Sequence, residues 1–291
     1  ITFIEIIALR IAGMETFDSI CHAFTTMPTG GFSTKNASIA HYDNPAIHYI
    51  IIIFMFVAGI NFTLHFRTIN GDLKAYYKDR EFLVYFSIIF IVSTIILLTL
   101  SCQTNTFSGL SLRESIFGTI AILTGTGYVL GDYELWPVFL QMILLTLMFI
   151  GGMGGSTTGG MKVIRVLLLV KYAATETRHM LHSRALLPVR IGRRYIKDDV
   201  VKNTLGFFLF FMSAFIISTL LLTAMDLDLV SSIGAAASAM GNIGPALGEF
   251  GPTDSYALMP VPGKWVLSFC MLLGRLEIFT VIVLFSRTFW K

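Results

Sequence analysis

Residues 111–128 read SLRESIFGTIAILTGTGY, a short apolar segment that runs into Thr124-Gly125-Thr126-Gly127-Tyr128. A helix of about a dozen residues is about 18 Å long, well short of the roughly 30 Å hydrocarbon core of a bilayer. Such a helix has to enter and return, which requires protein or water around its backbone. Glycine permits the positive φ values that let successive carbonyl oxygens face one lumen. The stretch therefore predicts a re-entrant helix that presents backbone carbonyls to a cation.

The same order of parts occurs twice more in the chain. Met14–Thr25 leads into TMPTGGF at residues 26–32, and Val230–Gly241 leads into NIGPALG at residues 242–248. We call residues 26–32, 124–128 and 242–248 the first, second and third knots. Three matching copies favour a pore over a set of extracellular loops with amphipathic caps.

The residue types within the knots suit a dehydrated potassium ion, which needs several oxygens without fixed charge. Threonine adds a hydroxyl at the inner mouth, and we expect the aromatic residues Tyr128 and Phe32 to pack their loops from behind. In the third knot, Pro245 restricts the backbone. The expected ion-binding residues are Thr29, Gly30, Thr126, Gly127, Asn242, Ile243 and Gly244.

The composition indicates a membrane protein. Of 291 residues, 55% are hydrophobic and 13% are charged, with a mean hydropathy of +0.74, whereas soluble domains carry about 25% charged residues. Three stretches reach the roughly 20 residues that a spanning helix needs: Ala46–Phe66, Phe82–Cys102 and Leu205–Met225. Further apolar stretches are Ile1–Ala12, read as the end of a helix, Trp136–Ile150 with Val163–Val170, and Trp265–Phe285.

The placement of charge predicts the topology. Eight basic and three acidic residues lie between Lys171 and Lys202, whereas the segments that carry the knots hold mainly acids. By the positive-inside rule the basic segments are cytoplasmic and the knots open outward. A basic segment tethered between spanning helices is more simply a topology signal than a nucleic-acid site, so no nucleic-acid partner is expected.

We predict an all-α membrane protein built from pseudo-fourfold repeats, each an outer helix, a re-entrant pore helix with its filter loop, and an inner helix. Three repeats are present, over residues 1–80, 81–200 and 201–291. Because a four-fold ring needs a fourth unit, we expect that an amino-terminal portion with the first repeat is absent from this sequence.

A glycine-rich break interrupts an apolar segment at residues 151–160. Its six glycines would each cost a helix about 1 kcal/mol relative to alanine, roughly 6 kcal/mol together. A phosphate-binding loop would need Gly-Lys-Ser/Thr after a strand, which is not the context here. A close-packing glycine seam between helices remains open. We favour an unwound gating loop over residues 151–161, with Gly151, Gly152, Gly154, Gly155, Ser156, Thr157, Thr158, Gly159 and Gly160 as its gating residues.

Arg275 and Glu277 are charges within the last apolar stretch, near the middle of its expected helix. Each would cost about 2.5–3.5 kcal/mol at the centre of a bilayer, so both should face protein or water. Residues two apart lie on different faces of a helix, so we do not expect them to pair with each other. A structural ion pair or carbonyl clamp is one interpretation. The other places Arg275 in the lumen, where it repels cations and braces the gating loop.

The chain resembles the Trk/Ktr/HKT superfamily of potassium transporters, closest to its TrkH-type membrane subunits. The resemblance is carried by Thr29–Ser33, Thr124–Tyr128 with Asp132 and Trp136, Gly151–Arg165, Asn242–Gly248 and Gly274–Glu277. It departs from the family pattern at Tyr128, where Phe is usual, and at Ala246, where Gly is usual. The resemblance implies four non-identical repeats in one subunit, a homodimer and a cytosolic nucleotide-binding regulatory ring of the TrkA type.

The function expected from these features is potassium uptake through a gated, channel-like pore in the inner (plasma) membrane of a bacterium, surrounded by membrane lipid. Potassium is the transported ion, no covalently bound cofactor is expected, and the chain is not expected to be an enzyme. The alternative is a secondary transporter with discontinuous helices, which would aim helix amino ends at an anionic substrate. An intramembrane hydrolase would need a Ser/His, paired-Asp or His-Glu-x-x-His arrangement, which the sequence does not contain.

Overall fold

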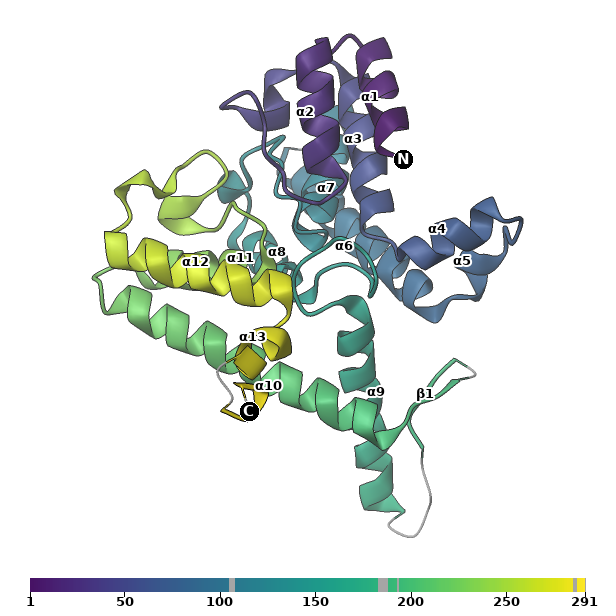
Figure 1. Cartoon of the computed structure of the whole chain (residues 1–291). Coiled ribbons are helices and arrows are strands. Elements are labelled where there is room, and N and C mark those ends of the chain that lie inside the picture. The colour runs from purple at the N-terminus through teal and green to yellow at the C-terminus, as the bar shows by residue number, and fades with distance from the viewer. Residues whose placement is uncertain (105–107, 183–187, 193, 285–286, 291) are drawn as a thin grey trace.

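The computed structural model describes residues 1–104, 108–182, 188–192, 194–284 and 287–290. These residues are mostly helical, and the helices form a bundle from which α9 and a small β-hairpin extend (Figure 1). Arg184 and Arg193 of the basic segment lie outside the described residues.

Two helices are long and apolar enough to cross a membrane as single rods, α6 (Arg80–Thr104) and α10 (Asp198–Thr223). Two bent pairs bring the possible spans to four among the described residues. In one pair α3 (Pro45–Ala58) and α4 (Phe62–Ile69) meet at 100°, and in the other α12 (Val261–Leu276) and α13 (Ile278–Leu284) meet at 111°. The apolar stretches Ala46–Phe66 and Trp265–Phe285 are therefore each interrupted by a bend and do not form one continuous helix over their described residues.

The first bend has local causes. The side chain of Asn61 accepts a hydrogen bond from the Thr63 N–H at 2.8 Å and so begins a new helix. Gly59 packs against the Tyr85 hydroxyl so closely that a Cβ would overlap it. The His65 ring bonds to the Val57 carbonyl at 3.0 Å and ties the two helices together.

The second bend lies at Glu277, whose φ of +63° is rare for a residue other than glycine. Arg275 consequently occupies the last turn of α12 rather than the middle of a helix. An apolar pattern does not reveal such a break, because neither flanking residue is glycine or proline.

The three short helices form as the sequence predicts, within two residues at each end. They are α2 (Thr16–Thr26), α7 (Gly109–Leu123) and α11 (Leu229–Gly241). Ser108 caps α7 by accepting from the Ser111 N–H at 3.0 Å, and Asp228 caps α11 by accepting from the Val230 N–H at 3.0 Å. From Ser231 onward α11 is almost entirely buried, because its small residues let neighbouring helices approach closely.

The remaining elements complete the bundle. The helices are α1 (Thr2–Ile11), α5 (Ala75–Lys78), α8 (Val138–Ile150) and α9 (Val163–Leu181). β1 (Arg190–Ile191) and β2 (Arg194–Tyr195) form an antiparallel hairpin that the sequence pattern does not indicate. Short 3₁₀ turns cover Ser38–His41, Tyr133–Leu135, Gly248–Phe250, Tyr256–Leu258 and Arg287–Trp290. One core cluster surrounds α3, α6, α7 and α8, and a second surrounds α10, α11 and α12.

Candidate functional site

The three knots share one backbone conformation. In each, a residue in the left-handed region lies within three residues of the end of the short helix, and a glycine two positions later is left-handed again. The φ values are +55°, +67° and +56° at Thr29, Gly125 and Asn242, and +66°, +71° and +102° at Gly31, Gly127 and Gly244. Residues other than glycine rarely adopt left-handed backbone angles, because these angles are sterically unfavourable for them. The recurrence of two such positions, two residues apart, in all three knots therefore identifies a common local structure.

This conformation sets the register between the knots. The counterpart of Gly127 and Gly244 is Gly31, whereas Gly30 corresponds to Thr126 and Ile243. The sequence pattern aligned Gly30 with Gly127 because the first knot contains two adjacent glycines, and only the backbone angles distinguish them.

The N–H groups of the knots turn back onto the helices that precede them. Gly31 donates to the Thr25 carbonyl at 3.1 Å, Gly127 to the Ala121 carbonyl at 3.1 Å, and Ile243 to the Ser238 carbonyl at 3.0 Å. The last carbonyls of each short helix are thereby satisfied. Because the helix dipole is negative at this end, the arrangement favours a cation beside the knots.

The knots lie against one another in chain order. A Cβ added at Gly31 would overlap the carbonyl oxygen of Thr126, and one added at Gly127 would overlap that of Ile243. Each glycine thus packs against the residue that lies between the two left-handed positions of the next knot. At Gly244 the described part of the chain places nothing within 4 Å of such a Cβ. The first knot therefore packs against the second and the second against the third, and the space beside Gly244 is open among the described residues.

Tyrosine hydroxyls brace the knots from outside. The Tyr128 hydroxyl lies 2.7 Å from the Thr25 hydroxyl and donates to the His22 carbonyl at 3.1 Å, so the second knot is tied to α2. Tyr133 donates to the Ala246 carbonyl and Tyr256 to the Gly244 carbonyl, each at 2.9 Å. The expected packing of Tyr128 behind its loop is observed, with 4% of the residue exposed.

The equivalent expectation for Phe32 is wrong, because 76% of this residue is exposed. Its ring lies beside the backbone of Gly30. Tyr128 is buried whereas Phe32 is exposed because the hydroxyl of Tyr128 has two hydrogen-bond partners, which hold this side chain in the interior.

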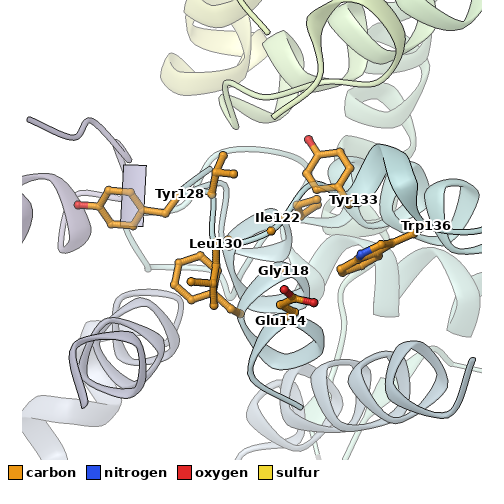
Figure 2. A pocket seen from close by; sticks show the side chains of 11 residues that line it. Glu114, Gly118, Ile122, Tyr128, Leu130, Tyr133 and Trp136 are labelled. Atoms are coloured by element: carbon orange, nitrogen blue, oxygen red, sulfur yellow. The ribbon is translucent and has the colours of Figure 1, made fainter. Parts of the chain in front are cut away.

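A cavity of about 10 Å³, room for about one water molecule, lies behind the second knot. Glu114, Gly118, Tyr133 and Trp136 line it, and the Tyr128 ring points away from these residues toward the amino-terminal helices (Figure 2).

The loops beyond the knots carry acidic side chains. Glu134, in the turn after the second knot, lies near Asp132 and Asp254. Burial, followed by the repulsion of these two carboxylates, raises the pKa of the Glu134 carboxyl above its ordinary value of 4.5. Negative charge at this end suits the approach of a cation.

The glycine-rich break is an irregular loop between α8 and α9, as predicted. It touches all three knots at the end where the short helices arrive. Thr157 donates to the Met27 carbonyl at 2.8 Å, and Thr29 donates to the Thr157 carbonyl at 3.1 Å. Gly159 packs against Gly241 at the third knot, where a Cβ would lie 2.5 Å from the carbonyl oxygen, and its nitrogen approaches Gly125 of the second knot.

Two further elements hold this loop. At the α3–α4 bend, the Met153 N–H donates to the Gly59 carbonyl at 2.9 Å and the Phe62 N–H donates to the Gly155 carbonyl at 3.1 Å. At the start of α6, one carboxylate oxygen of Glu81 accepts from the loop.

Three basic side chains gather at the loop. Arg275 donates to the Pro28 carbonyl at 2.6 Å, and its second nitrogen lies 3.5 Å from the Thr29 hydroxyl. Lys162 donates to the Thr158 carbonyl. Arg165 pairs with Glu277 at 2.7 Å and lies over the Phe207 ring at 4.1 Å. As expected, Arg275 and Glu277 have different partners.

The structure thus brings together the predicted residues of all three knots, the glycine-rich loop and Arg275. The pattern did not single out Gly31, the bracing tyrosines, Lys162 or Glu81. Lys162 carried a usable signal, because a lysine at the edge of an apolar stretch has to face protein or water. Among the described residues, no three His, Cys, Asp or Glu side chains form a group that could hold a metal ion.

The comparisons with known proteins agree with this architecture. The family model described as TrkH, cation transport protein, matches residues 1–291. The chain is 38% identical over 288 residues to the Trk system potassium uptake protein TrkH of Escherichia coli K12, covering 98% of this chain and 59% of that protein. It is 33% identical to the Trk system potassium uptake protein TrkG of the same strain, with the same coverage of each chain.

A solved structure has the same fold. The crystal structure of the potassium transporter TrkH from Vibrio parahaemolyticus superimposes with a TM-score of 0.93 at 37% sequence identity, covering 100% of this chain and 62% of that one. The chain spans 59% of the length of the curated relatives it matches.

Proposed function

The chain belongs to the TrkH family of cation transport proteins, and on that premise we propose that its three knots line a potassium-conducting pore. It is a multi-pass membrane protein of mainly helical fold. The observation that carries the proposal is the shared conformation of the knots, with the first packed against the second and the second against the third. Rings of backbone carbonyls replace the hydration shell of a potassium ion.

In this proposal the ion contacts the knots at Thr29, Gly30, Thr126, Gly127, Asn242, Ile243 and Gly244, with Gly31 added by the backbone register. The open sector beside Gly244 accommodates a fourth knot, which completes the ring. The units are the three pore repeats over residues 1–80, 81–200 and 201–291. Ions pass down their electrochemical gradient, and the chain catalyses no chemical reaction.

The loop of residues 151–161 is the gate in this proposal. It lies against all three knots on the side where the short helices end, so it obstructs the inner end of the pore. Arg275 adds a positive charge beside Thr29 on that side, which opposes entry of a cation. Opening requires the loop to leave the knots.

Assembly as a homodimer with a cytosolic, nucleotide-binding ring of the TrkA type is part of the same proposal, and it rests on the family resemblance. The relatives named as Trk system potassium uptake proteins support potassium as the transported ion. Placement in the bacterial inner membrane, with the basic segment around α9 in the cytoplasm, follows from the positive-inside rule.

The test is ion flux through the full-length protein in liposomes, measured by stopped flow with K⁺, Rb⁺, Na⁺ and a control anion. We expect K⁺ and Rb⁺ to pass faster than Na⁺ and the anion to be excluded. Faster passage of the anion would overturn the proposal and favour a transporter that aims helix amino ends at its substrate.

A further inference from the structure

Glu81 connects the glycine-rich loop to the outer helix of its own repeat. One oxygen of this half-buried carboxylate accepts from the Gly154 N–H at 2.6 Å and from the Ile164 N–H at 3.1 Å. Gly154 lies within the loop, and Ile164 lies in the first turn of α9. A single oxygen therefore ties the loop to the helix that follows it.

Both hydrogen bonds are strengthened because their acceptor is a carboxylate oxygen. A charged acceptor makes a hydrogen bond about twice as strong as a neutral one, and a carboxylate at the amino end of α9 also interacts favourably with the helix dipole. Within the described part of the chain, no other carboxylate accepts a hydrogen bond from the backbone of this loop.

Glu81 lies just after a helical hairpin whose start also contacts the loop. Residues 62–79 form the α4–α5 hairpin, which projects from the bundle to one side (Figure 1). At the start of the hairpin the Phe62 N–H donates to the Gly155 carbonyl at 3.1 Å, and just after its end Glu81 accepts from Gly154. The chain therefore contacts Gly155 at the start of the hairpin and Gly154 just after its end, and these two loop residues are adjacent.

We propose that Glu81 is a positioning residue that holds the loop against the knots, a contact that we call the latch. In this proposal, displacement of the α4–α5 hairpin moves the loop. The proposal rests on the proposed function of the loop as a gate. A displacement of the hairpin pulls on Gly154 and Gly155 together, whereas the contacts of Thr157 with the first knot resist it. Loss of the Glu81 oxygen leaves the two N–H groups without their acceptor and frees the loop.

The test measures the exposure of the loop rather than ion flux alone. In the full-length protein, with every native cysteine replaced, Cys21, Cys102 and Cys270 among them, Ser156→Cys provides a thiol within the loop. A membrane-impermeant thiol reagent is applied from the cytoplasmic side, and the labelling rate is compared among variants. Glu81→Leu removes the acceptor at similar volume, and Glu81→Gln restores a neutral acceptor oxygen. Ser87→Ala is the matched control on α6, because the one hydrogen bond of this hydroxyl among the described residues goes to the carbonyl of Leu83 in its own helix.

We expect Glu81→Leu to raise the labelling rate about a hundredfold, because two hydrogen bonds to a charged group are lost. Glu81→Gln, which keeps an acceptor oxygen without its charge, should label at a rate between those of the wild type and Glu81→Leu, and Ser87→Ala should label at the wild-type rate. Wild-type labelling in Glu81→Leu would overturn the proposal, and so would an equal rise in Ser87→Ala. If Glu81→Leu fails to insert, Glu81→Asp decides, since it withdraws the carboxylate by one methylene; faster labelling supports the latch and an unchanged rate refutes it.

The same samples separate this proposal from the proposed function. If the wild-type protein passes no potassium while labelling responds to Glu81→Leu, the pore is refuted and the latch stands. If potassium flux is normal and selective while labelling does not respond, the latch is refuted and the pore stands.

Discussion

Replacement of Gly127 by alanine tests whether the contact between the second and third knots sets the selectivity of the pore. The new Cβ would overlap the Ile243 carbonyl oxygen and lie 2.8 Å from its carbon, whereas ordinary contact begins at 3.4 Å. To relieve the contact between the new Cβ and the Ile243 carbonyl carbon, the two knots have to move apart by at least about 0.6 Å, and the contact with the oxygen requires a larger movement. The φ of +71° adds a backbone strain of about 1–2 kcal/mol.

A shift of this size moves carbonyls that should replace the hydration shell of the ion. We expect the K⁺/Na⁺ flux ratio in liposomes to fall at least about tenfold, equivalent to about 1.4 kcal/mol of lost discrimination. Gly31→Ala should lower this flux ratio to a similar extent, because its new Cβ would overlap the Thr126 carbonyl oxygen as that of Gly127→Ala overlaps the Ile243 oxygen.

The matched control is Gly71→Ala in the turn between α4 and α5. Gly71 also has a positive φ, +99°, but nothing described lies within 4 Å of its added Cβ. This variant carries the backbone strain without the collision, so its thermal midpoint should fall while its flux ratio stays at the wild-type value. A wild-type ratio in folded Gly127→Ala, or an equal loss in Gly71→Ala, would refute the reasoning.

Three other perturbations test separate parts of the site. Arg275→Ala removes the bonds to Pro28 and Thr29 and a positive charge from the inner end, so potassium flux in vesicles should rise several-fold; unchanged flux counts against Arg275 as a barrier. Tyr128→Phe removes the hydroxyl that ties the second knot to α2, which should cost about 1 kcal/mol of stability and lower the K⁺/Na⁺ ratio; an unaltered ratio and melting curve would show that the brace is dispensable. The pKa of Glu134 is raised in the folded protein, so the stability associated with its protonated form is present below pH 4.5 and is lost as pH rises through the folded pKa. Glu134→Gln should therefore raise the thermal midpoint at pH 8 and leave it nearly unchanged at pH 4, and a gain of equal size at both pH values would contradict this.

The short helices and the knots were predictable from the sequence because their signals are local. Ser111–Leu123 is too short to span a bilayer and is followed by Thr124-Gly125, and the structure places α7 at Gly109–Leu123. The glycine-rich break was equally clear, since six glycines exceed what a helix tolerates.

The bend at Glu277 and the tyrosine braces could not be predicted in this way because they depend on partners far along the chain. The turn at Glu277 persists in a strained conformation while Arg165, more than 100 residues earlier, pairs with the carboxylate. Likewise, of the two adjacent glycines only Gly31 has a positive φ and lies against Thr126, and the sequence does not reveal which of the two does so. Tertiary contacts decide such positions, and a linear pattern does not contain them.

Diffraction from crystals of the full-length protein soaked with Rb⁺ or Tl⁺ would locate the conducted ion. We expect anomalous density at the centre of the three knots, within contact of the backbone oxygens at Gly30, Thr126 and Ile243. Density confined to other parts of the molecule, with none between the knots, would contradict a carbonyl-lined pore in this chain.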